Sequence, residues 1–289
     1  MSTVASLPPF SLLLPVYQRD RPEHLEQAVR STVAGQTCPP SELVLVRDGP
    51  VGPELQQTID TLVASTPTQV VYVPLAENLG LADALTRGLD AASHEIVARM
   101  DADDVSAPTR FEKQVPVIQG GADIVGTALY EFIGDIDNVV QLRVPPLDAD
   151  RIRSEIRFRD PFNHPTVMYR RSAVSAAGGY AHMHLMEDYL LFARMLADGA
   201  VPANLAEPLV YYRVSHGAYA RRGGLDMLRA ELELQRRFRR EKITTTAQFV
   251  RNVAIRGGYR LLPEAVRRLA YRRVLLQADL KHARRRDGR

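Results

Sequence analysis

A short run of acidic residues follows an apolar segment near the middle of the chain. Residues 95–98 have the composition of a buried strand, and the run Arg99–Asp104 contains three aspartates. Asp101 and Asp103 point the same way if the backbone stays extended, because side chains alternate along a strand. Their carboxylate oxygens are hard ligands that suit Mg²⁺ or Mn²⁺. Taken alone, the run fits a metal site that holds a diphosphate and an ordinary turn equally well, since Asp also favours turns.

A second acidic pair, Glu187 and Asp188, begins a segment that we expect to be a helix over residues 187–197. A carboxylate can act as the general base that takes a proton from an attacking hydroxyl. The pair is also explained by the preference of a helix N-terminus for negative charge. Partial burial would raise the pKa of such a base towards neutral pH. The pair is our candidate catalytic site, with Asp188 as the base and Glu187 beside it.

The first hundred residues alternate between strand and helix patterns. We expect strands at residues 10–16, 43–46, 70–73 and 95–100, and helices at 21–33, 54–64 and 81–89. This alternation is typical of an α/β fold with a mostly parallel sheet flanked by helices, in which ligands bind beyond the carboxyl ends of the strands. Pro15, Tyr17, Asp48 and the Arg99–Asp104 run all fall at such ends. They should therefore converge on one crevice.

The second hundred residues show a more mixed pattern. We expect a helix from Ser106, as its N-cap, to Val115, a strand at 123–132, a helix at 148–157, an extended stretch at 162–169 and a last strand at 208–214. His164, within the extended stretch, is explained as well by polar packing as by function.

Composition restricts the class of protein. At 289 residues, with 45% hydrophobic and 25% charged residues, the chain suits one large globular domain, or one domain and an appendage. The single cysteine, Cys38, forms no internal disulfide and fits a reducing compartment. No stretch is long and apolar enough to span a bilayer, and the N-terminus lacks a basic leader and a cleavage pattern. We expect a cytoplasmic protein.

Charge is distributed unevenly along the chain. Residues 221–289 carry 20 Lys/Arg against 7 Asp/Glu, whereas residues 1–220 carry 17 against 27. We therefore expect a domain over residues 1–220 and a basic helical region over residues 221–289, with helices at 225–240 and 263–286. This region fits a set of solvated helices, or helices that lie on an anionic membrane surface at the inner face of the plasma membrane. No aromatic interleaving supports nucleic-acid binding.

Several ordered pieces resemble the family 2 glycosyltransferases, which have the GT-A fold. The pieces are Leu14–Tyr17, Val46–Gly49, Asn78–Gly80, Arg99–Asp104, Gly178–Tyr180, Glu187–Tyr189, and Tyr212–Arg213 followed by His216. Each piece is weak alone, but the set in this order is specific, and it covers roughly residues 10–220. Gly49 is followed by Pro50, where serine is commoner, and this resembles the exopolysaccharide and O-antigen subgroup that includes the amylovoran type.

The resemblance implies an inverting transferase that uses a nucleotide-sugar donor, usually UDP-linked, with Mn²⁺ or Mg²⁺. The resemblance implies that the donor is bound by Pro15, Tyr17, Asp48, Asn78, Arg99, Asp101 and Arg213. It implies that the metal is bound by Asp103 and His216. Asp188, with Glu187, would supply the base. The acceptor would be a glycan or a sugar on a polyprenyl diphosphate, used in surface polysaccharide synthesis.

The sequence departs from the common family pattern at Arg47, where many relatives have an acidic residue. Two other functions remain open from the sequence. A nucleotidyltransferase would normally carry a glycine-rich phosphate loop with a basic residue, and residues 12–17 have none. A nucleotide- or carbohydrate-binding module without catalysis would tolerate the loss of Asp188, whereas the enzyme would not.

Overall fold

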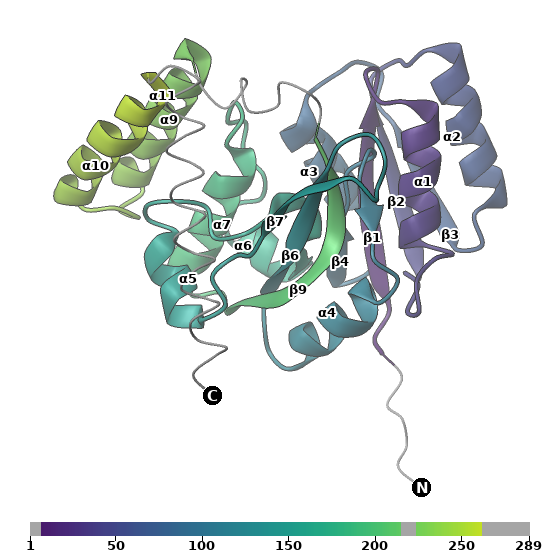
Figure 1. Ribbon diagram of the computed structural model, residues 1–289, viewed down its shortest axis with the longest axis horizontal. Helices are drawn as coiled ribbons and strands as arrows, with labels where there is room; N and C mark the ends of the chain where they lie inside the picture. Colours follow the sequence, from purple (N-terminus) through teal and green to yellow (C-terminus); the bar gives the residue numbers. More distant parts are fainter. Residues whose placement is uncertain (1–6, 215–223, 262–289) are drawn as a thin grey trace, which may run out of the picture. The chain divides into compact units, whose positions relative to one another are not determined.

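A computed structural model describes residues 7–214 and 224–261 of the protein (Figure 1). The chain forms two compact units, Met1–Val214 and Ser215–Arg289. The boundary that we predicted between residues 220 and 221 lies outside the described residues.

The first unit is built on a mixed nine-stranded sheet. Its strands follow the order β3-β2-β1-β4-β8-β6-β9-β5, with β7 paired to β6. The strands are β1 Phe10–Tyr17, β2 Glu42–Asp48, β3 Gln69–Pro74, β4 Ile96–Arg99, β5 Val105–Ser106, β6 Ile124–Phe132, β7 Val139–Arg143, β8 Met168–Arg170 and β9 Pro202–Arg213.

Only the first half of this sheet is parallel throughout. Strands β3, β2, β1 and β4 pair in parallel, as the strand–helix alternation predicts. Beyond β4, the pairings β4–β8, β8–β6, β6–β7 and β9–β5 are antiparallel, and β6–β9 is parallel. The expectation of a mostly parallel sheet is therefore corrected to a mixed one. Parallel neighbours need a long crossover, whereas β6 and β7 are joined by a short loop that makes them a hairpin.

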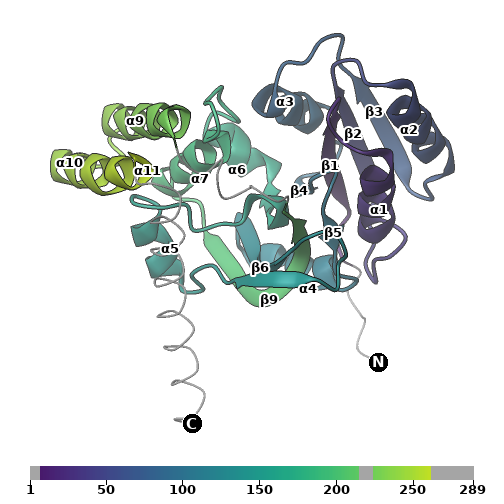
Figure 2. The same ribbon diagram turned by 45° about the horizontal axis from the view of Figure 1, so that its top comes forward.

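The helices of the first unit flank this sheet. They are α1 Pro22–Thr32, α2 Pro53–Ser65, α3 Leu81–Ala91, α4 Arg110–Gln119, α5 Ala149–Glu155, the 3₁₀ turn η1 His164–Thr166, α6 Arg171–Ala176 and α7 Glu187–Ala197. Figure 2 shows α3 and the pair α1 and α2 on opposite sides of strands β1 to β3. Helix α7 has the bounds that its apolar pattern predicts.

Two local predictions were wrong. Ser106 does not cap a helix, because Val105 and Ser106 pair with β9 as strand β5, and helix α4 begins only at Arg110. The expected extended stretch at residues 162–169 contains the turn η1 before strand β8. In both places a tertiary contact determines the local structure: sheet pairing at Ser106, and a hydrogen bond at Thr166, whose hydroxyl accepts from the backbone N–H of Thr127 at 2.9 Å.

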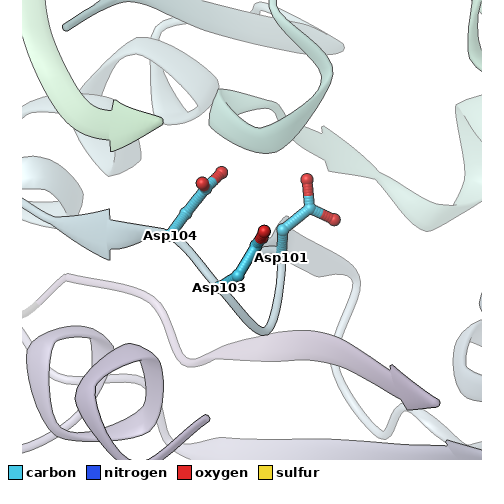
Figure 3. Close-up of side chains that lie close together, drawn as sticks. All are labelled: Asp101, Asp103 and Asp104. Atoms are coloured by element: carbon cyan, nitrogen blue, oxygen red, sulfur yellow. The ribbon is translucent and has the colours of Figure 1, made fainter. Parts of the chain in front are cut away.

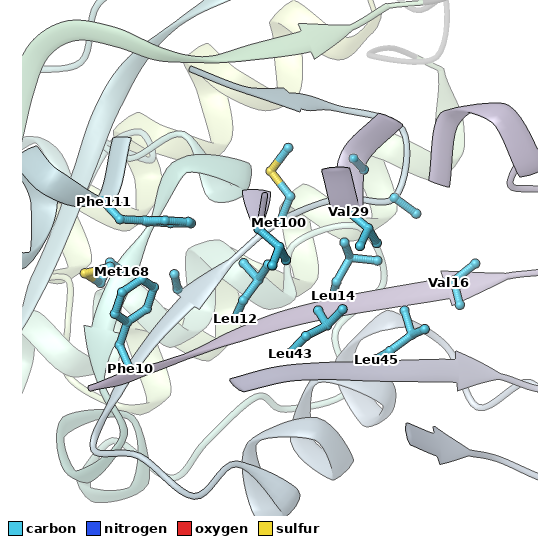
Figure 4. Packing of buried hydrophobic residues seen from close by; sticks show 14 of the residues in the cluster. Phe10, Leu12, Leu14, Val16, Val29, Leu43, Leu45, Met100, Phe111 and Met168 are labelled. Atoms are coloured by element: carbon cyan, nitrogen blue, oxygen red, sulfur yellow. The ribbon is translucent and has the colours of Figure 1, made fainter. Parts of the chain in front are cut away.

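The core of the first unit forms around strand β1. Phe10, Leu12, Leu14 and Val16 are buried on one face, in a cluster with apolar residues of α1, α2 and α4 (Figure 4). Leu13 lies on the opposite face, where helix α3 packs directly against the sheet at Gly88. Because both faces of β1 are covered, the carboxyl end of the strand is held rigidly at the sheet edge, where ligands bind in α/β folds.

The second unit contains α9 Leu225–Arg240, α10 Thr246–Asn252, the π-helix η2 Val253–Gly257 and α11 Gly258–Leu261. Helix α9 has the bounds predicted from its sequence, and the predicted helix at 263–286 lies outside the described residues. A buried polar network joins α9 to the later helices: both carboxylate oxygens of Glu231 accept from Arg256, at 2.6 and 2.9 Å. Among the described residues, no helix combines the length and apolar character needed to span a membrane.

The close contact between α3 and the sheet gives a test of the packing. A Cβ atom at Gly88 would overlap Leu13 Cδ1 and lie 2.8 Å from Val46 Cγ2. We expect Gly88→Val to lower the free energy of unfolding by about 2 kcal/mol, because the extra methyl groups overpack a closed interface. Urea denaturation measures this change. Gly52→Ala is the matched control, since no atom lies within 4 Å of the added Cβ, and an equal loss in both variants would contradict the packing argument.

Candidate functional site

Three carboxylates converge in the loop between β4 and β5, which we call the carboxylate loop (Asp101, Asp103 and Asp104; Figure 3). One oxygen from each lies within 4.8 Å of the others. Asp104 is fully buried, and the other two are half-buried. Burial and the neighbouring Asp101 raise the pKa of Asp103 to about 6. Burial, with Asp103 and Asp101 nearby, raises the pKa of Asp104 well above its usual range. The loop therefore concentrates negative charge that a cation would relieve.

Asp104 provides an independent sign that the loop fits a cation. Its Oδ1 accepts a hydrogen bond from the backbone N–H of Arg213 at 2.8 Å, whereas its Oδ2 is buried without any hydrogen-bond partner. A buried polar atom without a partner is costly and rare. Together with three hard oxygen donors, this free oxygen fits a divalent cation such as Mg²⁺ or Mn²⁺.

Arg99, at the end of β4, contacts the first aspartate of the carboxylate loop. Its guanidinium is 2% exposed and pairs with both oxygens of Asp101, with Nη1 donating to Oδ2 at 2.8 Å. Arg110 of α4 donates to the Arg99 carbonyl at 2.7 Å and so fixes the backbone there. Arg99 therefore fixes the orientation of the Asp101 carboxylate, and its predicted contact with the donor stays a prediction.

A cavity of about 380 Å³ opens beside the carboxylate loop, at the carboxyl ends of β1, β2 and β4. Six of the predicted donor- and metal-site residues line it: Pro15, Tyr17, Asp48, Asn78, Asp101 and Asp103. The parallel half of the sheet therefore brings together residues that lie up to 88 positions apart in the chain. Of the remaining predicted residues, Arg99, Glu187, Asp188 and Arg213 lie outside this lining, and His216 lies outside the described residues.

Asp48 fixes the shape of one wall of the cavity. Its carboxylate accepts hydrogen bonds from Asn78 Nδ2 at 3.0 Å and from the backbone N–H groups of Leu79 and Gly80 at 2.7 and 3.0 Å. Gly49 has a φ of +82°, and a Cβ there would lie 2.5 Å from the Asn78 nitrogen, so this close approach needs glycine. Asp48 thus ties the end of β2 to the loop that begins helix α3.

Arg47, where the sequence departs from the family pattern, belongs to a different environment. Its Nη1 donates to Gln56 Oε1 of α2 at 2.8 Å, and it does not line the cavity. The side chains of Arg47 and Asp48 leave the strand on opposite faces. Asp48 is therefore the acidic group that the end of β2 presents to the cavity.

Asp20 is a cavity residue that our reading of the sequence missed. Its Oδ2 accepts a hydrogen bond from the Tyr17 backbone at 2.8 Å, and it faces the carboxylate loop. Burial, followed by the charges of Asp103 and Asp101, raises the pKa of Asp20 to about 7. The available signal was an aspartate three residues after a strand end, a spacing that favours a side chain folding back on a turn.

The predicted base, Asp188, lies in the first turn of α7. Its Oδ1 accepts from the Tyr189 backbone at 2.7 Å, and its Oδ2 lies 3.4 Å from His164 Nδ1. Burial raises the pKa of Asp188, and burial with the neighbouring Asp188 charge raises the pKa of Glu187 to about 7. The positive charge of Arg99 opposes both increases. One guanidinium therefore acts electrostatically on the carboxylate loop and on the acidic pair.

Arg213, at the end of β9, uses all three guanidinium nitrogens as hydrogen-bond donors. Its Nε donates to the Asp103 carbonyl, its Nη1 to the Gly134 carbonyl and its Nη2 to Gln27 Oε1, each at 2.8 Å. Its plane also lies over the Phe132 ring, 4.5 Å from the centroid. In this arrangement Arg213 holds the backbone of the carboxylate loop, and its predicted contact with the donor stays a prediction.

Comparisons with known proteins agree with this geometry. The model of "Glycosyl transferase family 2" matches residues 11–178. The chain is 36% identical to the amylovoran biosynthesis glycosyltransferase AmsE of Erwinia amylovora, over 91% of this chain and 97% of the relative. It is 32% identical to the UDP-Gal:alpha-D-GlcNAc-diphosphoundecaprenol beta-1,3-galactosyltransferase of Escherichia coli, over 93% and 97%.

The fold comparison gives the same class. The crystal structure of Staphylococcus aureus TarS 1-349 in complex with UDP-GlcNAc superposes with a TM-score of 0.63 at 16% identity, over 86% of this chain and 71% of that one. The α/β sheet with flanking helices is therefore similar to the GT-A fold of TarS. With its matched domain, its curated relatives and its cavity at the strand ends, the chain belongs to glycosyl transferase family 2.

Proposed function

We propose that this glycosyltransferase is an inverting, divalent-metal-dependent enzyme that moves a sugar from a UDP-sugar to a hydroxyl of a polyprenyl-diphosphate-linked sugar or glycan in surface polysaccharide synthesis. The observation that carries the proposal is the carboxylate loop beside the cavity, with the unpartnered oxygen of Asp104. The names of the relatives support the substrates: one uses UDP-Gal and a diphosphoundecaprenol-linked acceptor, and TarS was solved with UDP-GlcNAc.

The cavity suits the nucleotide part of the donor. Tyr17 and Asp48, at the ends of adjacent parallel strands, would contact the base and ribose, and Asp101 would contact the ribose or sugar. Asp103 and Asp104 would hold Mn²⁺ or Mg²⁺, with His216 as a further candidate ligand. Such an ion, when bound, supplies positive charge to the departing diphosphate. The Arg99 pair keeps Asp101 oriented towards the donor, since both carboxylate oxygens contact a buried guanidinium.

Transfer with inversion needs one general base. The acceptor hydroxyl oxygen attacks the anomeric carbon as the bond from that carbon to the diphosphate oxygen breaks, and the diphosphate leaves with the bonding electrons. The hydroxyl proton passes to Asp188. The pKa of Asp188 is raised by burial, which brings the carboxylate closer to the range where a base is effective at neutral pH.

Substitution of the base separates this proposal from a binding module without catalysis. We expect Asp188→Asn to lower the transfer rate by about 10²–10⁴-fold, because the amide cannot accept the proton. UDP affinity should stay close to that of the wild type, since Asp188 does not line the donor cavity. Product formation from a panel of UDP-sugars with a lipid-diphosphate-linked acceptor, and UDP titration calorimetry, measure the two quantities. Asp198→Asn, on an exposed residue just past the other end of α7, is the control; full turnover by Asp188→Asn would rule out this base.

Metal dependence has a separate test at Asp103. We expect Asp103→Asn to weaken UDP binding in Mn²⁺ by about 10–100-fold, because the amide is a neutral and weaker ligand. Binding measured with a chelator present should differ little from that of the wild type. The control Asp90→Asn changes an exposed carboxylate of α3 outside the cavity. If Asp103→Asn keeps the full gain in UDP affinity on adding Mn²⁺, Asp103 does not belong to the metal site.

We also propose that the basic second unit brings the enzyme to an anionic membrane surface, where a lipid-linked acceptor would lie. Helix α9 carries exposed arginines at Arg229, Arg236 and Arg240, and their spacing of seven and four residues aligns them on one side of the helix. Each basic residue near anionic lipid contributes about 1 kcal/mol to binding.

Charge reversal on α9 tests this association. We expect Arg236→Glu with Arg240→Glu to reduce cosedimentation with phosphatidylglycerol-containing vesicles by at least about tenfold, because two attractive charges become repulsive. Vesicles of phosphatidylcholine alone should bind both proteins weakly. The same reversal at exposed Arg30 and Arg87 of the first unit is the control. Equal vesicle binding by the α9 variant and by this control would rule out α9 as the membrane-binding surface.

A further inference from the structure

His164 is a buried titratable side chain that the proposed reaction does not use. It lies in the turn η1, between strands β6 and β8 along the chain, and its ring is only 9% exposed. Its Nδ1 lies 3.4 Å from Asp188 Oδ2, and its Nε2 lies 3.0 Å from the Tyr180 hydroxyl. The ring also packs edge-on against Phe192 of α7, with centroids 5.7 Å apart. Both ring nitrogens therefore face polar partners, one of which is the proposed base.

The protonation states of His164 and Tyr180 indicate which group donates in each of these two contacts. Burial, and then the charge of Arg99, hold the pKa of His164 well below its usual range, so the imidazole is neutral and carries one N–H. Burial also raises the pKa of Tyr180 well above its usual range, so the phenol keeps its proton and donates it. Since an ionised carboxylate only accepts, the tautomer that gives both nitrogens a suitable partner carries its proton on Nδ1, on the side of Asp188, and accepts from Tyr180 at Nε2.

The other charged groups around Asp188 show why a hydrogen-bond donor from His164 matters. The charged and titratable groups that act on Asp188 and His164 are Glu187 from α7, Arg99 from β4, Asp101 from the carboxylate loop, Tyr169 from β8 and Tyr180 before α7. Within this set of described residues, only Arg99 is cationic. A neutral N–H group that donates to Asp188 stabilises the carboxylate without adding a second buried positive charge.

We infer that His164 is a positioning residue for the proposed base: it directs its Nδ1–H at Asp188 Oδ2, fixes the orientation of the carboxylate and keeps it ionised when the acceptor hydroxyl arrives. The inference rests on the proposed role of Asp188. The separation of 3.4 Å is longer than a usual hydrogen bond, and such contacts often tighten only in the complex with substrate. Tyr180 acts one step further away, by fixing which nitrogen of His164 carries the proton.

Two substitutions at His164 distinguish positioning from packing. In His164→Asn, the amide nitrogen occupies the place of Nδ1 and can still donate to Asp188. In His164→Gln, the amide reaches the place of Nε2 and faces Tyr180 instead. We expect His164→Gln to lower kcat by about 10–100-fold and to move the acidic limb of the kcat profile up by about one pH unit, because the carboxylate loses a donor. His164→Asn should stay within about fivefold of the wild type, with its acidic limb nearly unmoved.

A packing role predicts the reverse order. Gln is closer to His in volume than Asn, so Gln would then be tolerated at least as well, and neither variant would move the acidic limb. That outcome would overturn the inference. UDP affinity measured in Mn²⁺ should be unchanged in both variants and reports that the first unit is folded.

Tyr180→Phe provides a second variant that removes only one oxygen atom. We expect a smaller upward shift of the acidic limb, because Nε2 loses its donor and the Nδ1–H tautomer is less strongly favoured. If the His164 variants do not fold, a profile identical to that of the wild type in Tyr180→Phe overturns the inference.

Failure of the proposed base is distinguishable from failure of this inference. Full turnover by Asp188→Asn would rule out Asp188 as the base, and the role of His164 would fall with it. If Asp188→Asn is inactive but His164→Gln has a normal pH profile, only the role of His164 is ruled out.

Discussion

The buried ion pair between Arg99 and Asp101 is the interaction on which the rest of the site depends. A guanidinium that is 2% exposed carries a large desolvation penalty unless anionic groups surround it. Here one carboxylate pairs with it through both oxygens, and the charges of Asp104, Glu187 and Asp188 also act on the same region. Removing one partner of such a pair typically destabilises a protein by about 3–5 kcal/mol, because the other charge stays buried and unpaired. The positions of the acidic groups are thus coupled to one cation of the protein itself.

The sheet explains why this cation lies where it does. Strand β4 pairs in parallel with β1 on one side and antiparallel with β8 on the other. The parallel half provides the cavity at its strand ends, and the antiparallel half leads through η1, β8 and α6 to α7 with its acidic pair. Arg99 is the last residue of β4, so it lies where the two halves meet. A strand with neighbours of opposite direction thereby links a donor cavity on one side to a candidate base on the other.

Local patterns in the sequence predicted much of this arrangement, and the misses have physical causes. Periodicity predicted helix α7 from Glu187 to Ala197, because its apolar residues are buried through successive turns. It also placed Asp48 and the carboxylate loop at strand ends, where the cavity is found. Strand β5 at Ser106 depends on pairing with β9, about 105 residues further along the chain, and β4 pairs with β8 about 70 residues away, so no local pattern records either pairing.

Individual side chains were harder to predict than elements. Asp20 lines the cavity because a turn folds it back onto the Tyr17 backbone, and that turn has no hydrophobic periodicity to reveal it. His164 gave no preference between packing and function in the sequence, because its significance lies entirely in what surrounds it: a tyrosine hydroxyl on one nitrogen and a carboxylate on the other. Such relationships arise only when η1 and α7 are brought together in the fold.

The two roles that we propose, cation binding by the carboxylate loop and proton transfer to Asp188, place conflicting demands on a carboxylate. A carboxylate that binds a divalent cation gives its electron pairs to that cation, and its affinity for a proton falls accordingly. A general base must do the opposite and gain a proton during the reaction. Asp103 and Asp104 could not serve both tasks at once, even though burial raises the pKa of each. In the proposed mechanism, the base on α7 is kept ionised by Arg99 and the neutral His164, and it is separate from the carboxylate loop that would bind the cation.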